Sequence, residues 1–280
     1  MSRMKGIAQG GRRLLLHAVG VVLVNIAPAA AGERSLAAGD CPSQALGEPV
    51  KLAEAIGGDV LRLGDGRVVR LAGIDAARGS IDGPAGDGLA TAARDRAAAL
   101  AAGDAGLHLH KDLPDEDRHG RIHGEVILSD GRSLAAALVA EGLARVHPFV
   151  EETICVEPLL AAERAARKMH LGVWASHEYA IWQADDASLK GQNGLYELVE
   201  GRVVSVGARS RFTFIDFGRD WGRDFTVMLT ASLAADLAKA ASPVASLVHH
   251  RVRVRGVIEA RSGPLMRVEN AGQIELLDGD

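Results

Sequence analysis

Alternating apolar and polar side chains predict the secondary structure of the first half of the chain. Around the Gly64-Asp65-Gly66 turn, residues 50–71 alternate in the way typical of a β-hairpin. The alanine-rich residues 86–103 predict a helix that ends at Gly103. Four further elements are expected, two strands at 107–110 and 124–128 and two helices at 133–141 and 158–169.

The second half has a different pattern. Residues 176–194 are polar and irregular and are expected to be a linker. Beyond them the pattern is nearly all strand, at 198–206, 212–217, 225–229, 250–259 and 265–276. A short helix at 231–240 lies between the third and fourth of these strands. Five strands with a helix at this point fit a small Greek-key barrel of the OB type.

The first residues have the pattern of a targeting segment. Basic side chains before position 14 are followed by an apolar run, residues 14–27, and then by Ala29, Ala30 and Ala31. This order is typical of a secretory signal peptide over residues 1–31. The run is shorter than the roughly 20 residues that span a bilayer. We therefore expect cleavage near Ala31, no membrane span afterwards, and a periplasmic or secreted location in a bacterium.

The two cysteines, Cys41 and Cys155, would meet an oxidising environment after export. A single disulfide between them is one interpretation, and two unrelated buried thiols are the other. The sequence does not supply the Cα separation that decides between them.

Composition and charge exclude several classes of protein. With 280 residues, 48% of them hydrophobic, the chain is neither disordered nor of low complexity. Two cysteines exclude a disulfide-rich scaffold and a four-cysteine zinc module. Residues 45–175 carry fifteen basic against twenty acidic side chains, and residues 195–280 carry eleven of each. Neither half is basic, so tight nonspecific binding of long polyanions is not expected.

Three local motifs, at residues 57–63, 69–75 and 117–121, resemble those of the thermonuclease (staphylococcal-nuclease-like) family. Two further segments, 137–146 and 163–174, keep the order and spacing of that family. The resemblance covers about residues 50–175 and implies an OB-type barrel with three helices.

The C-terminal stretch resembles the extra domain that follows such nucleases in secreted bacterial proteins, on its segments 201–204 and 252–256. The expected fold is therefore mainly β with helices: a nuclease-like OB barrel followed by a second small OB-like β-barrel. The expected domains are a nuclease-like domain at 45–175, a linker at 176–194 and a C-terminal domain at 195–280.

The resemblance also implies a site for phosphodiester chemistry. It places metal-binding carboxylates on Asp59 and Asp75 and a carbonyl ligand on Ala76, a set of oxygen ligands that suits Ca²⁺. It places two phosphate-binding guanidinium groups on Arg70 and Arg121, whose planar forks suit bidentate contact with phosphate oxygens.

One position departs from the family pattern. Arg78 stands where the family has its catalytic glutamate, and a guanidinium group cannot accept a proton from water. It also adds a positive charge beside the implied metal. His119 is a possible substitute base, because a neutral imidazole accepts protons near pH 7. The simpler interpretation is that His119 is an ordinary turn residue.

Aromatic side chains gather in one segment of the C-terminal half. Five of the ten aromatic residues of the chain fall between positions 212 and 225, interleaved with arginines. One interpretation is stacking of nucleic-acid bases, with Trp221 exposed in a polar turn beside Arg219 and Arg223. The other is that Phe212, Phe214 and Phe225 fill the core of a small barrel.

Two functions remain open from the sequence. The first is an exported phosphodiester hydrolase that acts on DNA or RNA and is weakened by Arg78. The second is a catalytically inactive module of the cell envelope that binds nucleic acid or protein. The oligomeric state is not predicted.

Overall fold

The computed structural model describes residues 34–35, 47–78, 83–102, 106–111, 116–149, 155–220 and 222–277, with side chains of the first long helix described from residue 88. These residues belong to one compact unit, residues 31–280. The predicted signal peptide, Cys41 and Trp221 lie outside the described residues. Among the described helices, none has both the length and the apolar character that a bilayer span requires.

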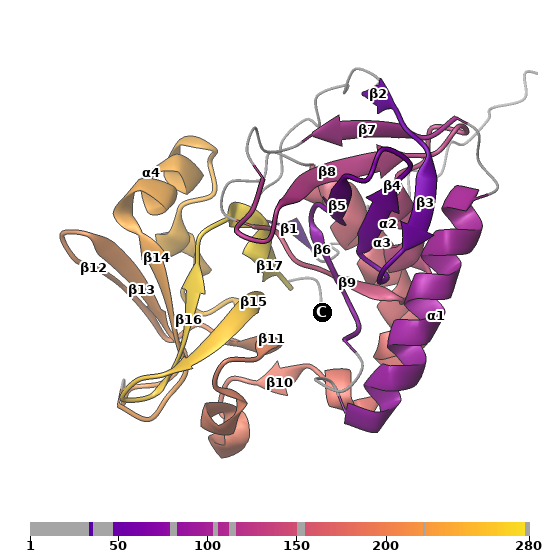
Figure 1. The fold of residues 1–280 in the computed structure, drawn as a ribbon. Coiled ribbons are helices and arrows are strands. Elements are labelled where there is room, and N and C mark those ends of the chain that lie inside the picture. The colour runs from indigo at the N-terminus through magenta and orange to yellow at the C-terminus, as the bar shows by residue number, and fades with distance from the viewer. Residues whose placement is uncertain are drawn as a thin grey trace, which may run out of the picture. The chain divides into compact units, whose positions relative to one another are not determined.

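The N-terminal half is built on an antiparallel meander (Figure 1). Its strands are β3 (Leu52–Ala55), β4 (Val60–Leu63) and β5 (Val68–Leu71). The turn between β4 and β5 passes through Gly66, whose φ of 91° is a conformation that glycine adopts without strain. The hairpin predicted over residues 50–71 is thereby confirmed.

The meander closes into a barrel through three more strands. These are β2 (Glu48–Pro49), β7 (His108–Lys111) and β8 (Arg121–Ile127). β8 pairs in parallel with β5 and antiparallel with β7, and β7 pairs with β2. Since β2 continues directly into β3, the ladders form a ring, which is the topology of an OB barrel.

Helix α1 (Gly83–Ala102) connects the meander to the second part of the barrel. Ala93, Ala97 and Ala101 recur every four residues on one face of α1 and are buried in the barrel core. Small side chains on this face let the helix lie close to the sheet, and the helix predicted at 86–103 is confirmed.

Two further helices complete this half, α2 (Leu134–Ala140) and α3 (Val156–Lys168), with a two-stranded ladder of β6 (Ile74–Ala76) and β9 (Ala144–Val146). After α2 the chain passes through Gly142, whose carbonyl accepts from the backbone of Val173 at 2.8 Å. A Cβ on Gly142 would lie 2.2 Å from the carbonyl oxygen of Leu171, so only glycine fits this contact.

The stretch 176–194, expected to be a linker, contains short regular elements. With the residues just before it, it forms three 3₁₀ helices and a strand: η2 (Gly172–Ala175), η3 (His177–Tyr179), β10 (Trp182–Gln183) and η4 (Ala187–Gln192). Tyr179 and Leu189 are buried, and β10 pairs in parallel with β11, the first strand of the C-terminal sheet (Tyr196–Arg202).

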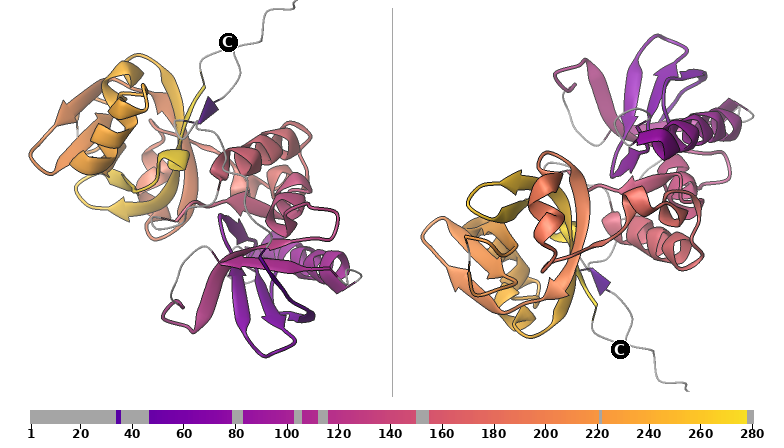
Figure 2. Two further views of the ribbon diagram at one scale, coloured as in Figure 1. Left: turned by 90° about the horizontal axis from the view of Figure 1, so that it is seen from above. Right: turned by 90° about the horizontal axis from the view of Figure 1, so that it is seen from below.

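The C-terminal half repeats the connectivity of the first barrel. The strands β12 (Ser205–Ala208), β13 (Phe212–Asp216) and β14 (Thr226–Thr230) form a meander, and α4 (Ala231–Lys239) follows it. β16 (Pro264–Val268) then pairs in parallel with β14 and antiparallel with β15 (Arg251–Ala260), which pairs with β11. Because β11 leads into β12 through residues 203–204, the sheet curls on itself (Figure 2).

Two of the predicted C-terminal strands are each divided in the structure. The strand expected at 198–206 is broken at Val203, whose side chain is fully buried where the chain turns from β11 into β12. The strand expected at 265–276 is interrupted by η6 (Ala271–Gln273), because the Asn270 side chain accepts from Gly272 at 2.8 Å and caps a helical turn. η6 leads into β17 (Ile274–Leu276), which pairs with β15 and with β1 (Arg34–Ser35). A further 3₁₀ turn, η5 (Val244–Leu247), precedes β15.

A buried ion cluster joins α3 to β15 and β17. The guanidinium of Arg255, with 0% exposure, donates to both carboxylate oxygens of Glu163 at 2.9 Å and also pairs with Glu275. Both glutamates are fully buried. The positive field of Arg255 and Arg253 outweighs the effect of burial and lowers the pKa of Glu275 to about 2.

Candidate functional site

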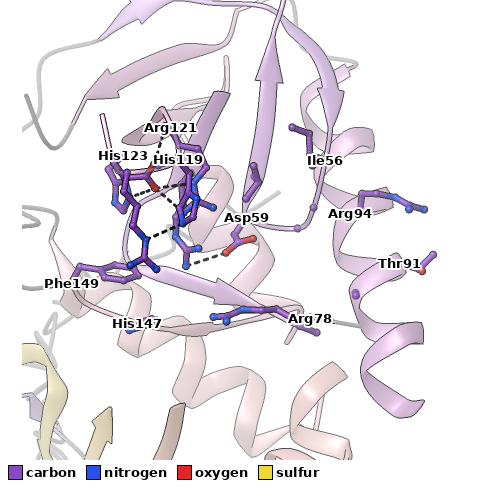
Figure 3. Close-up of a pocket in the computed structure, with 18 residues that line it drawn as sticks. Ile56, Asp59, Arg78, Thr91, Arg94, His119, Arg121, His123, His147 and Phe149 are labelled. Carbon is purple, nitrogen blue, oxygen red and sulfur yellow. Dashed lines mark hydrogen bonds and ion pairs between the residues drawn. The ribbon is translucent and has the colours of Figure 1, made fainter. Parts of the chain in front are cut away.

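A cavity of about 1060 Å³ lies against the N-terminal barrel, between β4, β5, β8 and α1. Figure 3 shows Arg121, His119 and His123 together on one side of it, and Thr91 and Arg94 on α1 on the other. Asp59 and Arg78 lie between these two groups. The cavity thus collects cationic side chains from elements that are far apart in the sequence.

Arg70, on β5, lines this cavity and is 9% exposed. Its Nη2 is 3.3 Å from Asp59 Oδ2 and 3.3 Å from Asp75 Oδ1. The guanidinium carbon lies 5.1 Å from the centroid of the Phe149 ring. Two carboxylates and an aromatic face therefore fix the orientation of this guanidinium group.

Asp75, on β6, is 5% exposed and pairs with a second arginine, Arg78, as well as with Arg70. Arg78 forms an ion pair with the same oxygen, Asp75 Oδ1, that faces Arg70. Burial alone would raise the pKa of Asp75, but Arg78 and the other cationic neighbours lower it. Burial raises the pKa of Asp59, and Arg70 opposes that effect only in part.

Arg121 reaches the cavity from the first residue of β8. Its guanidinium is held by Asp117, with Nη2 at 2.7 Å and Nε at 2.8 Å from Oδ2. The other oxygen of Asp117 accepts from the backbone N–H groups of His119 and Arg121, at 2.8 and 3.0 Å. These hydrogen bonds overcome the effect of burial and hold the pKa of Asp117 far below its usual range.

The parallel pairing of β5 with β8 explains why Arg70 and Arg121 meet. In this register Arg70 is opposite His123, and Val68 is opposite Arg121. Side chains two residues apart on a strand share a face, so Arg121, His123 and Arg70 all point to the same side of the sheet. Fifty residues of sequence separate the two arginines, and the pairing of β5 with β8 brings them to one face of the sheet.

The histidines of the cavity are poorly placed to accept a proton. His119 Nε2 already accepts from Arg118 Nε at 3.1 Å, so the neutral ring carries its hydrogen on Nδ1. His123 is buried, and its Nε2 lies 3.5 Å from Asp117 Oδ2.

His147 is half-buried between two aromatic rings, 4.2 Å from Phe149 and 3.9 Å from Tyr196 by ring centroids. Its enclosed Nδ1 has no hydrogen-bond partner among the described residues. Burial lowers the pKa of His147 to about 3, although the charge of Asp75 acts in the opposite direction. The ring is therefore neutral at physiological pH.

The structure brings together most of the residues that the resemblance singles out. Asp59, Arg70, Arg121 and His119 line the cavity, and Asp75 joins them through Arg70. Asp117, which organises the loop before β8, lies in the motif at residues 117–121 but was not predicted as a site residue. The sequence feature that could have identified Asp117 is the glycine three positions after it, Gly120, because this pattern is typical of an Asx turn.

The remaining predicted site residues lie elsewhere. Ala76 is buried on β6, opposite Ala144 of β9, and does not line the cavity. Arg219 and Arg223 are exposed between β13 and β14 of the C-terminal barrel, and Trp221 lies outside the described residues. Cys155 occupies the N-cap position of α3 and is disulfide-bonded, whereas its predicted partner Cys41 lies outside the described residues.

The donor set does not fit the calcium ion that the resemblance implies. The described residues contain no cluster of three or more His, Cys, Asp or Glu side chains able to hold a metal. Of the two implied acidic ligands, Asp59 faces Arg70, and Asp75 faces both Arg70 and Arg78. Two carboxylates opposed by two guanidinium groups leave no net negative charge to attract a hard cation.

Fold and cavity together define an OB-barrel domain with an arginine-lined cavity. Residues 68–176 match the family model described as Staphylococcal nuclease homologue. The resemblance predicted from the sequence is confirmed for this stretch, which contains Arg70, Asp75 and Arg121, whereas Asp59 lies before it. A search of curated proteins found no match.

Proposed function

We propose that this chain is a nuclease-like phosphodiester hydrolase that binds a DNA or RNA strand in the Arg70–Arg121 cavity. The observation that carries the proposal is the convergence of these two guanidinium groups, each held by a carboxylate, within a stretch that matches the nuclease family. Paired planar cations of fixed orientation suit the two non-bridging oxygens of a phosphodiester.

Hydrolysis would break one P–O bond and form another. A water oxygen would attack phosphorus, the bond to the leaving sugar oxygen would break, and negative charge would build up on the non-bridging oxygens. Arg70 and Arg121 would stabilise that charge, and their fixed positions mean that little reorganisation accompanies the reaction. One proton must leave the water, and one must reach the leaving oxygen.

Among the described residues, the site lacks a well-placed general base to take the proton from water. Arg78 replaces the carboxylate that would take the proton, and His119 becomes a base only if Arg118 releases its Nε2. Loss of a general base typically costs a factor of about 10²–10⁴ in rate. We therefore propose slow turnover. Arg78 would have to leave Asp75 before a calcium ion could assist the reaction. Activity is therefore to be measured both in the presence of Ca²⁺ and in the presence of a chelator.

Cleavage of a labelled single-stranded oligonucleotide tests the proposal. Wild type should cleave it slowly, and Arg121→Ala should lose that activity. Arg132→Ala, which removes an exposed arginine of the same barrel, should retain it. Equal rates for wild type and Arg121→Ala would refute hydrolysis in this cavity.

The ion pair between Arg78 and Asp75 favours a second candidate function, a catalytically inactive module that binds nucleic acid. In that case wild type binds the oligonucleotide, Arg121→Ala binds it more weakly, and neither cleaves it. If Arg78→Glu then cleaves the strand in the presence of a divalent cation, the domain is an intact scaffold whose base has been replaced.

We also propose that the protein is exported. Support comes from the basic, apolar and small-residue order of residues 1–31. Mass spectrometry of the mature chain isolated from a bacterial host should show an N-terminus near Gly32. A full-length chain starting at Met1 and retained inside the cell would contradict export.

A further inference from the structure

Two half-buried aromatic rings lie on the outer face of β13. Thr213 and Ile215 point into the C-terminal barrel, with 7% and 0% exposure, whereas Phe212 and Phe214 between them are only half-buried. The rings are tilted neighbours with centroids 6.5 Å apart. Phe225 alone of the three fills the core, so the core interpretation is wrong for Phe212 and Phe214. Two large apolar rings facing outward on a strand need a reason.

These rings line a cavity of about 590 Å³ on the barrel surface. Strands β12, β13 and β14 and the turn from β15 to β16 form its walls. Besides the two phenylalanines, its apolar lining includes Met228 and Leu265. This volume lies within the range of small-ligand sites, and one flat ring system has room to stack there.

Basic side chains come to the same cavity from two loops. Arg209, in the β12–β13 loop, is exposed, and within the described part of the chain its Nη1 donates to the carbonyl of Ala208, at 3.2 Å. Arg261, in the β15–β16 turn, is 59% exposed and lies 3.2 Å from Glu259, a carboxylate that it shares with Arg267.

One acidic side chain, Asp216, lines the cavity, and its carboxylate accepts hydrogen bonds from two hydroxyl groups. Ser205 donates to it at 2.9 Å and Thr226 at 3.3 Å. With two arginines and one such aspartate, the lining is net positive, although the barrel as a whole is neutral. Charge complementarity at this cavity therefore favours an anionic ligand.

We propose that this face of the C-terminal barrel binds single-stranded nucleic acid, with bases stacked on Phe212 and Phe214 and phosphates contacted by Arg209 and Arg261. The second and third strands of an OB barrel, with the loops between strands one and two and between four and five, form this surface, and oligonucleotides bind to OB barrels there. Aromatic stacking accepts any base, so binding depends little on sequence. The site is separate from the Arg70–Arg121 cavity and does not depend on hydrolysis there.

Fluorescence anisotropy with a labelled twelve-residue oligothymidylate tests the site on the full chain. All variants carry Arg121→Ala and are measured in a chelator, so that binding in the first cavity is weakened and is the same in every variant. Differences between the variants then report on the C-terminal barrel. The double variant Phe212→Ala/Phe214→Ala should bind about tenfold or more weakly. Phe212→Tyr/Phe214→Tyr, which keeps both rings, should bind normally, and this pair separates stacking from folding.

The arginines are tested by salt dependence. Arg209→Ala/Arg261→Ala should weaken binding and reduce the slope of log affinity against log salt by about 1.4, the value for two contacts with a single strand. Arg132→Ala, which removes one exposed positive charge from the other barrel, should leave the slope unchanged. Unchanged affinity in both Phe212→Ala/Phe214→Ala and Arg209→Ala/Arg261→Ala would overturn the proposal. Displacement of the oligothymidylate by a neutral oligosaccharide would also overturn the proposal, because the site would then bind carbohydrate.

Discussion

At the scale of single residues, the chemistry of the nuclease-like cavity depends on Arg78. Its guanidinium occupies the oxygen of Asp75 to which the resemblance assigns a cation. The family resemblance implied which residues would gather at this cavity, and the departure at position 78 was visible in the sequence. The sequence did not show that Arg70 and Arg78 would share one carboxylate oxygen, because that depends on how β5 and β6 meet in space.

Replacement of Arg78 should create a cation site. In Arg78→Glu, three carboxylates would surround Arg70, and we expect saturable Ca²⁺ binding by isothermal titration calorimetry where wild type shows none. Arg94→Glu, which makes the same charge change on α1, serves as the control and should not bind Ca²⁺. Equal heats for wild type and Arg78→Glu would contradict the account of the ion pair.

His147 should make the protein sensitive to mild acid. Its pKa is lowered to about 3, whereas an unfolded histidine titrates near 6.5. Between these values the unfolded chain takes up a proton that the folded state rejects, so stability falls as the pH drops below about 6.5. The free energy of unfolding should fall by at most about 1.4 kcal/mol per pH unit.

Denaturant unfolding at pH 7, 6 and 5 measures this slope. His147→Gln should flatten it, and His177→Gln, which changes an exposed histidine, should not. A slope that is the same in wild type and His147→Gln would show that the burial of this ring does not control the acid response.

At the scale of elements, the hydrophobic pattern predicted nearly every helix and strand of both barrels. It did not predict where strands break, because the breaks at Val203 and Asn270 depend on burial and on a side-chain cap rather than on alternation. It also did not settle which face of residues 212–217 is inside. Alternation defines two faces, and in β13 the smaller Thr213 and Ile215 fill the narrow barrel while the phenylalanines face outward.

The contact between Gly142 and the turn before η2 gives an element-scale prediction. Gly142→Ala adds both strain at a φ of 70° and a clash with the Leu171 carbonyl. We expect a loss of about 1–3 kcal/mol in the free energy of unfolding from strain alone, and more with the clash. Gly131→Ala, at a φ of 83° with open space around its Cβ, isolates the strain. Equal losses in the two variants would show that the close contact is unimportant.

At the scale of the whole molecule, a buried hydrogen bond and a buried ion pair connect residues of the N-terminal half with residues of the C-terminal half. Tyr196 of β11 donates to the carbonyl of Val146 at 2.8 Å, and Arg255 of β15 pairs with Glu163 of α3. The motif that contains Glu163 was recognisable from the sequence, but its partner Arg255 was not. Ninety-two positions separate them, and no local pattern relates a helix residue to a distant strand residue.

Removal of Arg255 should destabilise the molecule. Arg255→Met removes the cation that Glu163 and Glu275 share, although Arg167 still pairs with Glu163 and Arg164 with Glu275. We expect a loss of up to about 3–5 kcal/mol in denaturant unfolding. Arg251→Met, which removes a side chain that is 43% exposed and lies 3.2 Å from Glu200, should cost much less. Comparable losses in the two variants would mean that the buried cluster stabilises the fold no more than an exposed ion pair does.

The central claim is that Arg70 and Arg121 hold one phosphodiester between them. The most direct test is an NMR titration of the full chain with the dinucleotide pTpT, observing the arginine Nε–H signals assigned with Arg70→Lys and Arg121→Lys. The account predicts that both signals shift together and saturate at a single dissociation constant. If neither signal moves, or if only signals of the C-terminal barrel respond, the cavity is not a phosphodiester site and the account is wrong.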